Sequence, residues 1–197
     1  MDDAELKASK AAMRRRVLAA RDALDPVARL EASLALPDLL PRCAQLEALA
    51  RDGRVIAGFH PIRSEIDPRP LMVRLADLGA ILALPAVVDE TTIVFRELVR
   101  TVPLEAGAFG TAQPPASAAE LRPAALLVPL SAFDATGARL GYGGGFYDRA
   151  MERLARKGDL VSIGVAFADQ QVQAVPTGTH DRRLSGVLTE RGYVPAG

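Results

Sequence analysis

The sequence predicts an α/β fold, built on a parallel or mixed sheet that helices cover on both faces. Two observations carry this prediction. Short apolar segments, typical of buried strands, alternate along the chain with longer segments whose apolar residues recur at helical spacing. Hydrophobic residues make up 49% of the 197 positions, which is enough for a substantial core. We therefore expect a single domain over residues 1–197.

Apolar spacing and capping residues predict four helices. Asp25 has the side chain of an N-cap, and Pro26 suits the first helical position. In the same way Asp67 caps and Pro68 opens a later helix, which Gly79 closes. The predicted helices cover residues 4–23, a segment that begins at 26, a segment between 67 and 79, and 146–158.

Six apolar or β-branched segments predict the strands. They lie at 54–59, 80–85, 91–98, 124–130, 160–167 and 185–190. Four prolines and many small residues make 101–123 mostly loop.

Composition and charge exclude several classes of protein. The formal net charge is zero, so no large basic surface indicates nucleic-acid binding. A single cysteine, Cys43, excludes an internal disulfide and a zinc knuckle. The apolar stretch at 78–88 is too short to span a bilayer and contains Pro85. The first ten residues are acidic and polar, which argues against a secretory signal. We expect a cytoplasmic protein that binds neither membrane nor nucleic acid.

The densest glycine cluster lies in "RLGYGGGFYDR", residues 139–149, between a predicted strand and a predicted helix. A glycine-rich turn that enters a helix presents free N–H groups and the positive end of the helix dipole to an anion, above all to phosphate. Arg139 could contact phosphate, and Asp148 could hold Mg²⁺. The spacing matches neither a P-loop nor a dinucleotide-binding fingerprint. The alternative is a flexible or tightly packed turn.

Three further groups are candidates for a site. Lys10 and Arg14 share a helix face, where they would bind a polyphosphate or form an ordinary solvated basic face. Glu65 follows the first predicted strand, so it would bind an amino-bearing ring or favour the next helix N-terminus. Asp181 follows His180 and would be a metal ligand or part of a turn.

These residues resemble a known family. The segment "LLVPLSAFDATGARLGYGGGFYDRAMERL", residues 126–154, is similar to the signature of the 5-formyltetrahydrofolate cyclo-ligase family. The Lys10–Arg14 pair, the Glu65 segment, "GAFGTAQP" at 107–114 and the stretch that ends at His180–Asp181 also resemble the family. The matches follow the same order over nearly the whole chain.

The resemblance implies a three-layer α/β/α sandwich with a mostly parallel or mixed central sheet. It implies an enzyme that uses ATP and Mg²⁺ to convert 5-formyltetrahydrofolate to 5,10-methenyltetrahydrofolate, through phosphorylation of the formyl oxygen, with release of ADP and phosphate. It also assigns roles to residues. The ATP-binding residues would be Lys10, Arg14, Arg139, Leu140, Gly141, Tyr142, Gly143, Gly144, Gly145, Phe146 and Tyr147. Lys10 and Arg139 would be catalytic; His60, Glu65 and Tyr142 would contact folate; Asp148 and Asp181 would hold the metal. We expect small-molecule partners and a monomer.

One departure from the family pattern concerns the metal. The family's second aspartate after the His-Asp pair is replaced here by Ser185, and two arginines stand before it at 182–183. If that carboxylate supports the metal, Mg²⁺ binding is weaker in this chain. Two rival interpretations are kept: a related ATP-dependent ligase or kinase with another substrate, and a non-catalytic module that binds nucleotide or folate.

Overall fold

Five α-helices form in the computed structural model, which describes residues 2–197. They are α1 (Asp3–Asp22), α2 (Pro26–Leu39), α3 (Ala44–Arg51), α4 (Arg69–Asp77) and α5 (Phe146–Ala155). Asp25 caps α2 as the sequence predicts, because its carboxylate accepts the N–H of Ala28 at 2.9 Å. Short 3₁₀ turns lie at Leu40–Arg42 (η1), Ala108–Gly110 (η2) and Ala168–Gln170 (η3).

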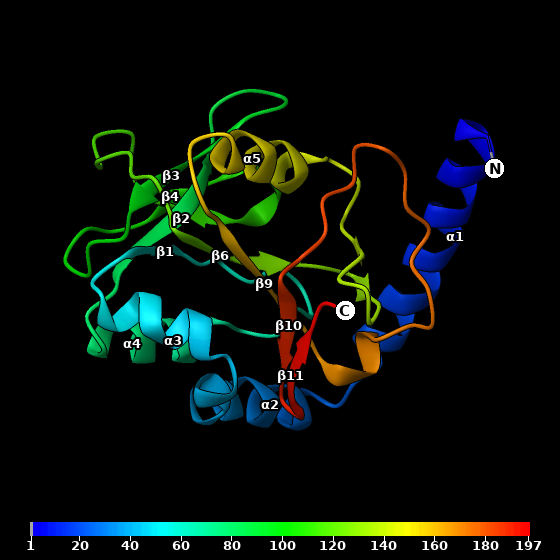
Figure 1. Ribbon diagram of the computed structural model, residues 1–197, viewed down its shortest axis with the longest axis horizontal. Helices are drawn as coiled ribbons and strands as arrows, with labels where there is room; N and C mark the ends of the chain where they lie inside the picture. Colours follow the sequence, from blue (N-terminus) through cyan, green and yellow to red (C-terminus); the bar gives the residue numbers. More distant parts are fainter. Residues whose placement is uncertain (1) are drawn as a thin grey trace.

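The centre of the molecule is a mixed sheet (Figure 1). Its strands, in spatial order, are β11 (Gly192–Pro195), β10 (Gly186–Thr189), β9 (Val161–Val165), β6 (Ala125–Pro129), β1 (Val55–Ala57), β2 (Ile81–Val87) and β3 (Ile93–Glu97). The run from β10 to β2 is parallel, and β11 and β3 join antiparallel at the two edges. Two small hairpins pair β4 (Glu105–Ala106) with β5 (Ala112–Gln113), and β7 (Ala132–Phe133) with β8 (Arg139–Leu140).

Alternation along the central strands separates two cores, because successive strand side chains point to opposite faces. Ile56 packs with the residues of α2, α3 and α4, whereas its neighbour Ala57 packs with those of α5. Figure 1 shows α5 over one face of the sheet and α2, α3 and α4 under the other. The predicted three-layer α/β/α arrangement is therefore confirmed. Helix α1 lies to one side of these layers.

Some elements differ from the sequence-based prediction. Helix α3 and the edge strand β11 were not expected, nor were the two hairpins. Helix α4 begins at Arg69 with Pro68 in the N-cap position, one residue later than predicted. The Asp67 carboxylate still accepts the Arg69 N–H, at 2.9 Å, so it satisfies one of the free donors at the start of this helix.

The order of the strands marks where a ligand would bind. From β1 the chain continues to β2 on one side and later to β6 on the other, so the topology reverses between β1 and β6. In open α/β sheets ligands lie outside the carboxyl ends of the strands at this point. Within residues 2–197, no helix has both the length and the apolar character needed to cross a bilayer.

Candidate functional site

The loop after β1 carries Glu65 at the predicted edge of the sheet. Its Oε2 atom accepts the N–H of Ile62 at 2.8 Å, while Oε1 is buried and has no hydrogen-bond partner among the described residues. Burial raises the pKa of the Glu65 carboxyl, because desolvation disfavours the charged form. The Ile62 N–H, the Tyr142 hydroxyl and the Arg21 and Arg63 guanidinium groups offset part of that rise in pKa.

The glycine loop, residues 141–145, joins β8 to α5. Gly143 and Gly145 have φ values of +104° and +66°, which side-chain-bearing residues rarely adopt. At Gly144, a Cβ atom would lie 2.9 Å from the Phe146 ring. These glycines are therefore required by the backbone path. No side chain caps the N-terminus of α5, so its first N–H groups remain available to an anion.

Helix α1 brings two of the predicted cations to this loop. The Arg14 Nε donates to the Gly141 carbonyl at 2.7 Å, and a Cβ on Gly143 would lie 3.6 Å from an Arg14 Nη atom. One helical turn earlier, the Lys10 ammonium pairs with the Asp181 carboxylate. The predicted ATP-binding residues of α1 therefore meet both the glycine loop and the predicted metal ligand Asp181.

Arg139 is more enclosed than a simple phosphate-binding arginine. Its side chain is only 4% exposed, and Nη2 donates to Asp148 Oδ1 at 2.9 Å. Its Nη1 donates to the Arg182 carbonyl, and the Arg182 N–H donates to the same Asp148 oxygen at 3.0 Å. The structure thus joins the predicted catalytic arginine to one predicted metal ligand and to the residue that follows the other, Asp181.

The two carboxylates predicted to hold Mg²⁺ each use only one oxygen in hydrogen bonds within the chain. Asp148 uses Oδ1, and Asp181 uses Oδ2, which accepts from Lys10 and from the Gly178 N–H at 2.7 Å. The second oxygen of each carboxylate accepts no hydrogen bond from residues 2–197. Over the same range, no three His, Cys, Asp or Glu side chains cluster as a metal site would. This donor set fits Mg²⁺, which is usually held by one or two carboxylates together with substrate phosphates and water.

Ser185 lies outside this group of contacts. Its hydroxyl accepts the N–H of Ser162 at 3.1 Å, beside the start of β9 and β10. The Ser185 side chain, which replaces the family's second aspartate, is therefore hydrogen-bonded to the backbone of strand β9.

Two tyrosines lie near Glu65. The Tyr142 hydroxyl accepts a hydrogen bond from Arg21 Nη2 at 2.7 Å, and burial together with the Glu65 charge raises the pKa of Tyr142 to about 12. Burial, followed by the Glu65 charge, also raises the pKa of Tyr147. The Tyr147 hydroxyl is buried with no hydrogen-bond partner in the described chain, and so is Nδ1 of His60. The structure does not connect His60 to the other site residues by a hydrogen bond within residues 2–197.

The aromatic and apolar members of the glycine stretch have structural contacts. The Phe146 ring lies 5.9 Å from the ring of Phe109, and the Arg149 guanidinium stacks 5.3 Å from its centroid. The Phe-Gly loop matched in the sequence therefore lies beside the glycine loop. Leu140 packs in a small apolar cluster with Val17 of α1. The Leu140 side chain is thus part of the scaffold.

Sequence reasoning missed Arg21. This residue, in the last turn of α1, is 2% exposed and donates from Nε to Ser64 Oγ at 3.0 Å. The signal was its spacing: Lys10, Arg14 and Arg21 are four and seven residues apart, so they lie on one helix face.

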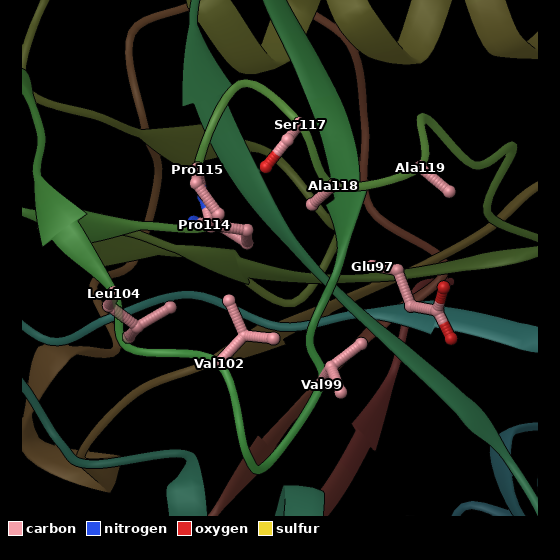
Figure 2. Close-up of a pocket in the computed structure, with 9 residues that line it drawn as sticks. All are labelled: Glu97, Val99, Val102, Leu104, Pro114, Pro115, Ser117, Ala118 and Ala119. Carbon is pink, nitrogen blue, oxygen red and sulfur yellow. The ribbon is translucent and has the colours of Figure 1, made fainter.

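A separate hollow of about 260 Å³ lies beside β3 (Figure 2). It is lined by Glu97, Val99, Val102, Leu104, Pro114, Pro115, Ser117, Ala118 and Ala119. None of these is a predicted site residue. The described lining offers one carboxylate and no cation, so it does not suit an anionic ligand such as a nucleotide.

Comparison with known proteins gives a consistent result. The model of the 5-formyltetrahydrofolate cyclo-ligase family matches residues 6–190. The 5-formyltetrahydrofolate cyclo-ligase of Mycolicibacterium smegmatis is 34% identical over 158 residues, which cover 76% of this chain and 80% of that protein. The enzyme of the same name from Haemophilus influenzae is 31% identical over 144 residues, which cover 70% and 76%.

A solved structure is similar over nearly the full length. The NMR structure of Aquifex aeolicus 5,10-methenyltetrahydrofolate synthetase aligns with a TM-score of 0.75 and 26% identity, covering 95% of this chain and 92% of that one. The structure of the synthetase from Mycoplasma pneumoniae, at 21% identity and a TM-score of 0.69, shares the fold. The chain therefore belongs to the 5-formyltetrahydrofolate cyclo-ligase family, a family of ATP-dependent ligases.

Proposed function

We propose that this enzyme converts 5-formyltetrahydrofolate and Mg·ATP to 5,10-methenyltetrahydrofolate, ADP and phosphate. The observation that carries the proposal is the meeting of two loops, one after β1 and the other between β8 and α5, which Arg21 joins. One loop holds Glu65, whose Oε1 is buried without a partner among the described residues. The other is the glycine loop, with an uncapped helix N-terminus and the cations of α1 beside it.

The glycine loop and α5 are suited to the nucleotide phosphates. Free N–H groups and the helix dipole favour negative charge, and Arg14 and Lys10 add two cations on one side. Arg139 pairs with Asp148, which holds that carboxylate in place, and it contributes a further positive charge. Phosphoryl transfer depends mainly on positioning and charge neutralisation, which residues of this kind provide.

Asp148 and Asp181 are the residues that would hold Mg²⁺, each through its remaining oxygen. Mg²⁺ held there would neutralise charge on the substrate phosphates. Within the chain, Arg139 and Lys10 each pair with one oxygen of these carboxylates and so orient them.

The folate would lie on the Glu65 side. A buried carboxylate with one unsatisfied oxygen can accept hydrogen bonds from the amino-bearing pterin ring, and His60 and Tyr142 lie in the same pair of loops. This arrangement would present the formyl oxygen to the γ-phosphate. Transfer of the phosphoryl group converts that oxygen from a poor leaving group into a phosphate ester. The second folate nitrogen then attacks the formyl carbon, loses its proton, and phosphate departs as the ring closes. No enzyme nucleophile is required.

The test is a mixture of the protein, Mg·ATP and 5-formyltetrahydrofolate, followed by the near-ultraviolet absorbance of the methenyl product. We expect the band to grow only when ATP and Mg²⁺ are both present, with one ADP formed for each product. ATP hydrolysis without the band would indicate an ATP-dependent ligase or kinase of another substrate. Nucleotide binding without any turnover would indicate a binding module.

A further inference from the structure

Arg21 is a buried arginine whose charge is not paired with a hydrogen-bonded carboxylate. It is 2% exposed, the lowest value for a charged side chain in residues 2–197, and it ends the α1 face that begins with Lys10 and Arg14. Burying a guanidinium is costly unless its donors are paired, and structural arginines usually pair with a carboxylate. Neither hydrogen-bond acceptor of Arg21 is a carboxylate.

The two acceptors belong to the two loops of the proposed site. Nε donates to Ser64 Oγ at 3.0 Å, one residue before Glu65, and Ser64 in turn donates to the Asp22 carboxylate. Nη2 donates to the Tyr142 hydroxyl in the glycine loop at 2.7 Å, and the guanidinium carbon lies 5.8 Å from the ring centroid. One planar group therefore fixes both loops relative to α1.

The third nitrogen of Arg21 and the charge of its guanidinium also concern the site. Nη1 is buried and has no hydrogen-bond partner among the described residues. The Arg21 charge also acts on the Glu65 carboxyl and on the Tyr142 hydroxyl, which places both within its field. A guanidinium with a fixed fork of donors can hold two acceptors in one geometry, whereas a lysine ammonium on a flexible stem cannot.

We propose that Arg21 is a positioning residue of the reaction, which holds Tyr142 of the glycine loop and the Glu65 loop in one register so that folate meets both. This inference rests on the proposed function. Arg21 acts through Ser64 and Tyr142, so its loss should weaken folate binding more than nucleotide binding, because the nucleotide phosphates keep Lys10, Arg14 and the N–H groups at the start of α5.

The experiment compares Arg21→Lys, Tyr142→Phe and the double variant, with Arg16→Lys as the matched control on an exposed position of α1. We expect Arg21→Lys to raise the folate KM about tenfold, as expected for the loss of a hydrogen bond from a charged donor. The ATP KM should stay within about twofold of the wild-type value. Tyr142→Phe keeps the ring and removes only the hydroxyl that accepts from Arg21, so it should also raise the folate KM.

The double variant distinguishes positioning from two unrelated effects. If Arg21 acts through Tyr142, the double variant should be no worse than Arg21→Lys alone, because the second change removes nothing further. A merely structural role would lower the active fraction, and so kcat, while both KM values stayed unchanged. Provided that the wild-type enzyme is active, a lower kcat with unchanged KM values would overturn the proposal. Fully additive effects of the two substitutions on the folate KM would also overturn it, and so would an equal effect of Arg16→Lys. A wild-type protein that forms no methenyl product would instead refute the proposed function, and with it the reaction that Arg21 is said to serve.

Discussion

Replacing Glu65 with glutamine should weaken folate binding and stabilise the protein at the same time. The amide keeps the shape of the side chain. Its oxygen can still accept the Ile62 N–H, which in the wild-type protein lies 2.8 Å from Oε2. What disappears is a charge whose Oε1 is buried without a partner in the described chain. Because a hydrogen bond to a charged group contributes about 1.5–3 kcal/mol, the folate KM should rise roughly 10- to 150-fold.

The effect on stability has the opposite sign. Relieving a buried, unsatisfied charge should raise the free energy of unfolding by roughly 1–2 kcal/mol at neutral pH. For a chain of this size that corresponds to an increase in Tm of about 2–8 °C. The native pKa of Glu65 is raised, so between its ordinary value of 4.5 and the raised value the folded state binds more protons than the unfolded state. Wild-type stability therefore falls as pH rises through that window, and the gap to Glu65→Gln opens there.

The assays are initial rates of methenyl formation and thermal unfolding, measured from pH 4 to pH 8. Glu90→Gln is the matched control, because Glu90 is exposed and should change neither quantity. A Glu65→Gln enzyme with a wild-type folate KM, or with an increased ATP KM instead, would remove Glu65 from the folate side. A lower Tm in the variant than in the wild type at pH 8 would refute the claim that the buried Glu65 charge destabilises the folded protein.

Three further variants test the nucleotide side. Arg139→Ala should lower kcat on the order of 100-fold, because it removes both a positive charge and the partner of Asp148; steady-state kinetics showing wild-type turnover would exclude Arg139 from the site. Asp148→Asn should raise the Mg²⁺ concentration for half-maximal rate at least about tenfold, and an unchanged Mg²⁺ titration would assign the metal to other residues. Gly143→Ala should lower activity, because the φ of +104° is unfavourable for alanine. Gly53→Ala is its control in the same kinetic assay, since Gly53 also has a positive φ, +65°, but lies outside the site; equal activities in the two variants would show that the loop geometry is not needed.

The central fold was predictable because its signals are local and strong. The parallel strands are short apolar runs, and Asp25 with Pro26 marks the start of α2 in the sequence itself. Helix α3 was missed because Cys43, its N-cap residue, makes no side-chain cap and Pro41 precedes it, so the pattern merges with that of α2. Strand β11 has four residues at a sheet edge, too few for a period to be read.

The structure brings several of the predicted site residues together, but the contacts among them could not be predicted from the sequence. The glycine pattern and the family resemblance located Arg139, Asp148 and Asp181 in the chain, but nothing local says that Arg139 would be enclosed by Asp148 and the Arg182 carbonyl. The spacing of Arg21 places it on the helix face of Lys10 and Arg14, but its role could not be predicted, because its acceptors lie 43 and 121 residues away. Long-range partners of this kind depend on the assembled sheet.

Helix α1 is attached to the body in a way that links ligand binding to local unfolding. Only Val17 and Arg21 are buried along it, and its apolar contact is a small cluster separate from the two main cores. Such an element opens at a lower free energy than the central strands, so its amide hydrogens should exchange with solvent first. Lys10 and Arg14 contact the same segments that the nucleotide would occupy. A nucleotide at 100 times its Kd would then raise the free energy of opening of α1 by about 2.7 kcal/mol. Slower exchange of the α1 amide hydrogens would therefore report that the site is occupied.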